Sequence, residues 1–85
     1  MRPSGNKRLL DALATEMKAR RKELNISQEE LALRCTLDRP YVTLVEGSRK
    51  QPTLSVLYKI AVALELSFSQ FAARIDKRYK ALPLE

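Results

Sequence analysis

Basic side chains are the residues of this sequence whose chemistry is most evident. Lysine and arginine number 16 against 10 aspartates and glutamates, which gives a formal net charge of +6. A basic balance of this size favours a polyanionic partner, either nucleic acid or an anionic membrane. The alternative interpretation is a surface charge that only keeps the protein dissolved.

Membrane insertion and secretion are disfavoured by the pattern of apolar residues. No apolar run approaches the roughly 20 residues that a membrane span needs, and no hydrophobic signal segment opens the sequence. The apolar residues recur at helical spacing and are needed for a core, which leaves little for a membrane surface. We therefore expect a cytoplasmic protein with no membrane partner.

The residues that catalysis and metal binding usually need are scarce. The sequence has no histidine, so the commonest general base and most zinc sites are excluded. The one cysteine, Cys35, follows Leu31 and Ala32 closely, so we expect a buried, small hydrophobic side chain. No nucleophile–base pair, metal cluster or phosphate-binding loop is evident. We expect no enzyme activity, no metal and no cofactor.

The spacing of apolar residues predicts an all-α fold without strands, built around one core. A flexible N-terminal arm is expected over residues 1–6, one domain over 7–80, and a frayed C-terminus over 81–85. The expected helices cover residues 7–24, 28–35, 39–46, 54–64 and 68–79.

Residues that typically cap helices stand at the expected boundaries. Asn25 is a candidate left-handed cap after the first helix. Ser27 and Glu30 have the spacing of a capping box, in which each side chain accepts a hydrogen bond from the other residue's backbone amide. Further N-caps are expected from Asp38, Thr53 and Ser67.

The expected helices 28–35 and 39–46 are short and are separated by a short turn, which is the spacing of a helix-turn-helix. Ala32 is small where the two helices would cross, and Val42 and Val45 would fill the inner side of the second. A short second helix held away from the domain fits the major groove of DNA, which is roughly 12 Å wide. A generic helical hairpin has the same spacing.

Three segments carry a closer resemblance: ARRKELNISQEELALRC, LDRPYVTLVEGSRKQPTL and LYKIAVALEL. From about Met17 to Phe71 the sequence resembles the Cro/C1-type (XRE, lambda-repressor-like) helix-turn-helix family. The second segment is also similar to controller proteins of restriction–modification systems. The resemblance implies a compact five-helix domain that binds double-stranded DNA.

The family resemblance implies roles for individual positions. Contacts with base edges are implied for Arg39, Pro40, Thr43 and Leu44. Contacts with phosphates are implied for Gln28, Tyr41, Arg49 and Lys50. Arg39 is the best candidate for base readout, because a guanidinium can bind guanine O6 and N7 together. Arg21 and Glu46 match a pair expected to form a structural salt bridge between the helices 7–24 and 39–46.

Simpler interpretations remain open for most of these positions. Arg39 would instead clamp a phosphate or pair with Asp38, and Leu44 would face a partner protein. Tyr41 would pack half-buried. The remaining polar side chains would only be solvated; these are Gln28, Thr43, Arg49 and Lys50.

The sequence departs from the family pattern at three turns. Thr36 stands where the turn between the two short helices usually has glycine, so it must adopt a positive φ or the turn must change. The usual loop glycine falls one position early, at Gly47, and is followed by Ser48. Glu65 replaces the glycine that commonly ends the fourth helix.

Proteins that read DNA with one short helix usually act as symmetric dimers on inverted repeats. Val56, Val62 and Ala63 lie off the core side of helix 54–64, and helix 68–79 is rich in aromatic residues. We expect a homodimer through helix 68–79 and part of 54–64; closure of the core alone is the alternative. The segment RIDKRYK is expected to be solvated or to add a nonspecific DNA contact.

The expected function is a sequence-specific transcriptional regulator that occupies an operator as a dimer, as a repressor or controller protein does. Repression and activation both remain open, and activation would require contact with RNA polymerase. The alternative is an antitoxin-type module that neutralises a partner toxin and regulates its own gene. Its toxin would then bind near Val56 and Val62 or on helix 68–79.

Overall fold

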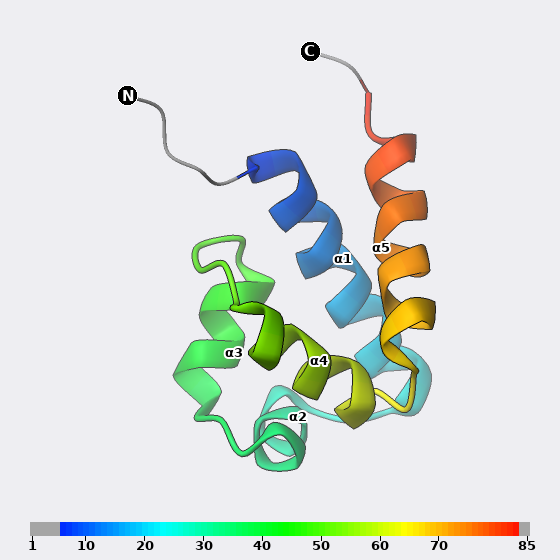
Figure 1. Ribbon diagram of the computed structural model, residues 1–85. Coiled ribbons are helices and arrows are strands. Elements are labelled where there is room, and N and C mark those ends of the chain that lie inside the picture. Colours follow the sequence, from blue (N-terminus) through cyan, green and yellow to red (C-terminus); the bar gives the residue numbers. More distant parts are fainter. Residues whose placement is uncertain (1–5, 84–85) are drawn as a thin grey trace.

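The computed structural model describes residues 6–83, and within them the chain forms five helices and no strand, as expected (Figure 1). α1 and α5 run side by side in opposite directions, and α1 also packs against α3. α2 packs against both α3 and α4. The helices are α1 (Lys7–Leu24), α2 (Gln28–Cys35), α3 (Arg39–Glu46), α4 (Leu54–Ala63) and α5 (Phe68–Ala81).

Each helix begins at a polar residue whose side chain accepts a hydrogen bond from a backbone amide in the first turn. Such caps satisfy amides that otherwise lack partners, and each stabilises its helix by about 1 kcal/mol. The expected caps are confirmed, and one more is found at the start of α1. The N-caps are Asn6, Ser27, Asp38, Thr53 and Ser67.

The expected capping box of α2 is only half formed. The Ser27 hydroxyl accepts from the Glu30 amide at 3.0 Å, as predicted. The Glu30 carboxylate, however, accepts from Arg34 Nε at 3.1 Å, so the expected return bond to Ser27 was wrong. A bond to a cation one helical turn away is charge-assisted, which favours it over the neutral amide. A complete box joins Ser67 and Gln70 at the start of α5 instead.

Among the residues that the structure describes, four other than glycine adopt a left-handed backbone, and three of them lie at the departures from the family pattern. Asn25 ends α1 with φ 57°, as predicted. Thr36 and Glu65 stand where the family usually has glycine, and both adopt a left-handed backbone, with φ 57° and 63°. At the third turn Ser48 is the left-handed residue, with φ 59°. Each such position costs roughly 1–2 kcal/mol relative to glycine.

The C-terminal ends of α4 and α5 differ from the prediction, as do parts of the expected flexible arm and frayed C-terminus. α4 ends at Ala63, because Leu64 caps it with a backbone outside the helical region. α5 continues to Ala81, and Arg8 of α1 donates hydrogen bonds to the carbonyls of Leu82 and Pro83 just beyond its end. Residues 81–83 are therefore held rather than frayed.

At the other end, Asn6 caps α1 and donates a hydrogen bond to the Tyr79 hydroxyl at 3.2 Å. It is therefore not part of a flexible arm. The expected arm residues 1–5, and residues 84–85, lie outside the described residues.

All five helices contribute side chains to one apolar core. Its fully enclosed members include Cys35, which is 2% exposed, and burial raises the pKa of its thiol. The other large members are Leu13, Met17, Leu31, Val42, Val45, Ile60, Leu64, Phe71 and Ile75. Within residues 6–83 no single helix is long and apolar enough to cross a membrane, although the pair α4–α5, bent by 100°, has the length and composition.

Candidate nucleic-acid interface

α2 and α3 are joined by residues 36–38 into one rigid unit. The Leu37 amide donates to the Ala32 carbonyl at 2.9 Å, and the Thr36 amide donates to Leu33 at 3.2 Å. Leu31 and Ala32 of α2 and Val42 of α3 are buried in the core. The core therefore fixes the angle of α3 relative to the rest of the domain.

The four residues expected to contact bases lie together on the outer face of α3. Arg39, Pro40, Thr43 and Leu44 are all exposed. The residues that point inward from the same helix, Val42, Val45 and Glu46, are buried. The spacing i, i+1, i+4 and i+5 brings the four outward residues onto one face. α3 thus offers a free surface that includes one cation, one hydroxyl and two apolar side chains.

Arg39 is free to reach a ligand. Its side chain is 61% exposed, and its nearest acid is Glu29 of α2, with Nη1 at 3.9 Å from Oε1. Asp38 does not pair with Arg39, because the Asp38 carboxylate caps the Tyr41 amide. An exposed ion pair at this distance contributes little to stability, so Arg39 can readily leave Glu29 and bind another anion.

Three of the four residues expected to contact phosphates, Tyr41, Arg49 and Lys50, lie in α3 or in the loop after it, whereas Gln28 begins α2. Arg49 and Lys50 are exposed in the loop between α3 and α4. The Arg49 amide donates to the Leu44 carbonyl at 2.9 Å, which ties the loop to the helix. Lys50 Nζ lies 5.9 Å from the centre of the Tyr41 ring, and burial raises the pKa of the Tyr41 hydroxyl. Tyr41 is half-buried, so it combines packing with a position beside the Lys50 cation.

The Gln28 side chain already has hydrogen-bond partners on α3. Its Nε2 donates to Glu46 Oε1 at 3.0 Å, and its Oε1 accepts from the Thr43 hydroxyl at 2.9 Å. A phosphate contact by this amide would compete with both hydrogen bonds. The sequence did not predict this link between α2 and α3.

Arg21 and Glu46 form the ion pair that the resemblance implied. Arg21 Nε and Nη2 donate to the two carboxylate oxygens at 2.7 and 2.9 Å, and Nη1 donates to the Ile26 carbonyl at 3.0 Å. The hydrogen bond with Glu46 raises the pKa of Arg21. The Glu46 side chain is 2% exposed, so the pair holds the end of α3 against α1 in a desolvated setting.

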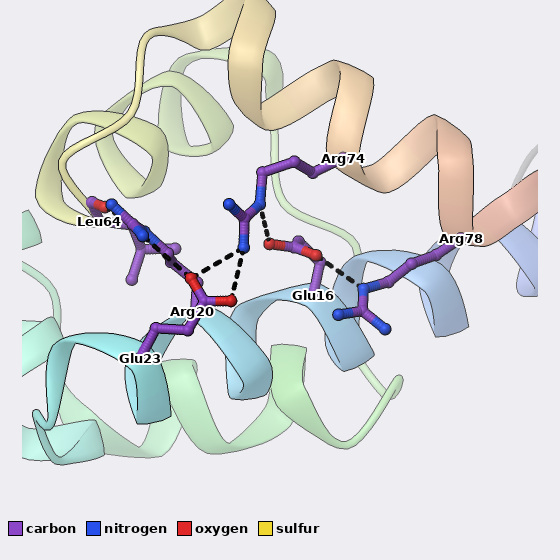
Figure 2. Close-up of polar contacts among 6 residues, drawn as sticks. All are labelled: Glu16, Arg20, Glu23, Leu64, Arg74 and Arg78. Carbon is purple, nitrogen blue, oxygen red and sulfur yellow. Dashed lines mark hydrogen bonds and ion pairs between the residues drawn. The ribbon is translucent and has the colours of Figure 1, made fainter.

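A second buried carboxylate, Glu16, was not anticipated from the sequence. Figure 2 shows Arg74 and Arg78 of α5 reaching across to Glu16 of α1. Arg78 Nε donates to Glu16 Oε1 at 2.6 Å, and Arg74 Nε donates to Oε2. Both arginines belong to the segment RIDKRYK, so the prediction of a solvated or DNA-binding tail was wrong for them. The signal was available, since Glu16 lies between core residues Leu13 and Met17.

The cluster extends along the contact between α1 and α5. Arg74 Nη2 donates to both carboxylate oxygens of Glu23 at 3.0 Å (Figure 2). Arg20 also donates to Glu23, at 2.9 Å, and its Nε donates to the Leu64 carbonyl at the end of α4. The network therefore joins three helices on a side of the molecule that excludes the α3 residues described above.

Apolar side chains are exposed along one side of α4. Leu54, Tyr58 and Val62, spaced one helical turn apart, are 72%, 56% and 58% exposed. We call these three residues the α4 stripe. Tyr58 stacks on Phe68 of α5 with ring centres 5.5 Å apart, so the stripe continues onto α5. An apolar hollow of about 400 Å³ lies among α1, α4, α5 and the loop before α4, and its lining includes Leu9, Leu57, Phe68 and Phe71.

Two of the three residues expected to lie off the core side of α4 are in fact buried or partly buried. Ala63 is only 7% exposed, and Val56 is partly buried against the core. Both side chains therefore face the core, and only Val62 of the expected three belongs to the α4 stripe. Among residues 6–83, no three acidic or cysteine side chains come close enough to hold a metal ion.

Comparison with known proteins places this geometry in a family. A model of the helix-turn-helix family matches residues 17–71. A protein described as a hypothetical transcription factor of Neisseria meningitidis serogroup B is 40% identical over 70 residues, which are 82% of this chain. This chain spans 66% of the length of that protein. The control protein C.MunI of a Mycoplasma species is 32% identical over 60 residues, which are 71% of this chain and 81% of C.MunI.

A solved structure is similar over most of the fold. It is the tetramer of the restriction–modification controller protein C.Esp1396I in complex with its natural 35 base-pair operator. The TM-score is 0.79 at 30% identity, over 85% of this chain and 95% of that one. From the family match and these relatives, the chain belongs to the XRE-type helix-turn-helix family.

Proposed function

We propose that this chain is a sequence-specific, DNA-binding transcriptional regulator whose α3 lies in the major groove of its operator. The outer face of α3 carries the proposal: Arg39, Pro40, Thr43 and Leu44 are exposed there while the opposite face is buried. Family membership and the operator complex of the relative C.Esp1396I support the same function. Because such a regulator acts on DNA, we assign it to the cytoplasm and assign it no enzymatic reaction.

In this proposal the loop after α3 supplies much of the affinity. Arg49 and Lys50 are exposed and lie beside the proposed base-reading face. Cations that neutralise phosphates release bound counterions, so the affinity for any duplex should fall steeply with salt. The side chain of Arg39 would add specificity, since it can bind guanine O6 and N7 together.

We further propose that the active form is a homodimer on an inverted repeat. A short α3 reads only a few base pairs, and two copies related by a two-fold axis would read two half-sites. The α4 stripe is exposed apolar surface that continues at the partly buried Phe68, and it would pair with a second copy. The C.Esp1396I relative forms a tetramer on its operator, which supports assembly of more than one copy.

A different protein partner could use the same apolar surface. RNA polymerase or a toxin bound to the α4 stripe would cover the residues that the homodimer needs. Sedimentation of the purified protein separates these alternatives. A dimer at micromolar concentration assigns the stripe to a second copy, and a monomer leaves it open to another partner.

The proposed function is tested by selecting bound fragments from random double-stranded DNA. We expect enrichment of an inverted repeat whose half-sites lie about one helical turn apart. Failure to enrich any sequence from the random pool would refute sequence-specific DNA binding. Enrichment of a single half-site without symmetry would refute the dimer but not the DNA-binding function.

A further inference from the structure

The hydroxyl proton of Thr43 is held by acceptors of the protein itself. Thr43 Oγ1 lies 2.9 Å from Gln28 Oε1 and 3.1 Å from the Arg39 carbonyl oxygen, and both atoms can only accept. The Thr43 side chain nevertheless lies on the exposed face of α3. A hydroxyl has one proton and two lone pairs, so the lone pairs and the methyl group remain for a ligand.

The orientation of the Gln28 amide is fixed by a chain of bonds that begins at Arg21. The Arg21 guanidinium donates to both oxygens of the buried Glu46 side chain. Glu46 Oε1, which accepts from Arg21 Nη2, also accepts from Gln28 Nε2 at 3.0 Å. With its nitrogen turned to Glu46, Gln28 presents its oxygen to Thr43. The reverse orientation would place two acceptor oxygens against each other, without a proton between them.

We propose that Thr43 reads the amino group of an adenine or a cytosine in the major groove, acting as a hydrogen-bond acceptor whose polarity Gln28 fixes. This inference rests on the proposed function and names the base chemistry at one position of α3. Adenine N6 and cytosine N4 are the donors in the major groove, whereas guanine O6 and N7 and thymine O4 are acceptors. A threonine whose hydroxyl proton is free can donate to an acceptor on a base or accept from a donor on a base. Because the internal bonds hold the proton, Thr43 can only accept, and it therefore selects bases with a donor group.

The test compares wild type with Thr43→Val and Thr43→Ser on the operator selected above. Affinity is measured by fluorescence anisotropy for every single base-pair change in one half-site. Wild type should prefer an adenine or cytosine over guanine or thymine by about two- to tenfold at one position, as expected for a single neutral hydrogen bond. Thr43→Val keeps the shape and should lose this preference, while Thr43→Ser keeps the hydroxyl and should retain it. Thr15→Val replaces an exposed threonine in α1 and serves as the control.

Base analogues isolate the amino group. At the position that Thr43→Val relaxes, purine replaces adenine, or 2-pyrimidinone replaces cytosine, so that only the amino group is removed. Wild type should lose affinity by about the same factor as in the base-pair scan, and Thr43→Val should lose none. An unchanged wild-type affinity, or relaxation at a guanine or thymine edge, would overturn the inference and leave operator binding standing.

Gln28→Met tests the role of the amide. Methionine has a similar length but no acceptor oxygen for Thr43, which leaves only the longer bond to the Arg39 carbonyl, at 3.1 Å, to hold the hydroxyl proton inward. The ratio of the affinity for operators with an adenine or cytosine at the Thr43 position to the affinity for operators with another base there should fall. This holds even if the variant binds all DNA more weakly. An unchanged ratio would overturn the assignment to Gln28. A wild-type protein that enriches no operator would refute the proposed function itself.

Discussion

Arg78 of α5 donates its Nε proton to the buried Glu16 of α1 at 2.6 Å, across the contact between these two helices. Arg74 binds the other oxygen of the same carboxylate. Two cations from one helix therefore converge on one anion that is 2% exposed. The partners satisfy the carboxylate, but their own side chains stay one-third exposed or more, at 33% and 38%.

Replacing Glu16 with glutamine should loosen α5. The two arginines would lose the charge that attracts them, and charge-assisted hydrogen bonds are worth about 1.5–3 kcal/mol. We expect the free energy of unfolding in urea to fall by roughly 1–3 kcal/mol. Glu29→Gln, at a side chain that is 70% exposed, is the control. A Glu16→Gln loss no larger than that of the control would contradict a stabilising role for the cluster.

Removing Arg21 alone should be more damaging than removing the Arg21–Glu46 pair. Arg21→Met leaves the Glu46 carboxylate buried with only Gln28 as a donor. Breaking a buried pair in this way typically costs about 3–5 kcal/mol, whereas replacing both partners with apolar groups is often nearly neutral. The double variant Arg21→Met, Glu46→Leu should therefore recover most of the loss in urea unfolding. Equal losses in the single and double variants would argue against the pair as the cause.

Stability should fall in acid partly through Glu23. Hydrogen bonds from Arg20 and then Arg74 lower the pKa of this carboxyl below its ordinary value of 4.5. Because the folded pKa is the lower one, the stabilisation is complete above the ordinary value and is lost as the pH falls through the folded value. Urea midpoints measured from about pH 6 to pH 3 should therefore drop less steeply in Glu23→Gln than in wild type. Parallel curves would exclude Glu23 as a contributor.

Arg39→Ala and Arg49→Ala should affect DNA binding differently. Without Arg39 the ratio between operator and random duplex should fall by about five- to a hundredfold, since a bidentate base contact is lost. Without Arg49 both duplexes should bind more weakly, and the slope of log affinity against log salt should shrink by about one unit. Anisotropy titrations from roughly 50 to 200 mM salt measure both effects. Equal losses on both duplexes for Arg39→Ala would refute its assignment to base readout.

A charge in the α4 stripe should separate the proposed dimer. Val62 is 58% exposed in the monomer, so Val62→Glu should fold normally but would bury an unpaired carboxylate in the interface. We expect the dimer dissociation constant to rise by about tenfold or more in sedimentation equilibrium. Leu33→Glu, at a leucine of α2 that is 71% exposed, is the matched control. If both variants dimerise like wild type, the stripe is not the interface.

The helices could be predicted because their signals are local. An apolar residue every three or four positions places one face of each helix, and Asp38, Thr53 and Ser67 mark starts from within a single turn. The ends that were wrong depend on distant residues. Leu82 and Pro83 are held by Arg8, which precedes them by more than 70 positions, and no pattern within α5 contains that information.

The candidate site divides in the same way. The exposed face of α3 follows from helical periodicity together with the family resemblance. The internal bonds of Gln28 could not be predicted, because they need α2 and α3 to be packed at one particular angle. Glu16 was missed because glutamate in a helix is usually exposed, and its arginines lie 58 and 62 positions away.

The left-handed Thr36 bears on how proteins of this kind are recognised. It occupies the position where the family usually has glycine, and the turn keeps the same handedness with φ 57°. A consensus pattern that demands glycine there would pass over this chain, although α2 and α3 are packed together. Backbone shape is therefore the safer criterion for finding further members whose turns have dispensed with that residue.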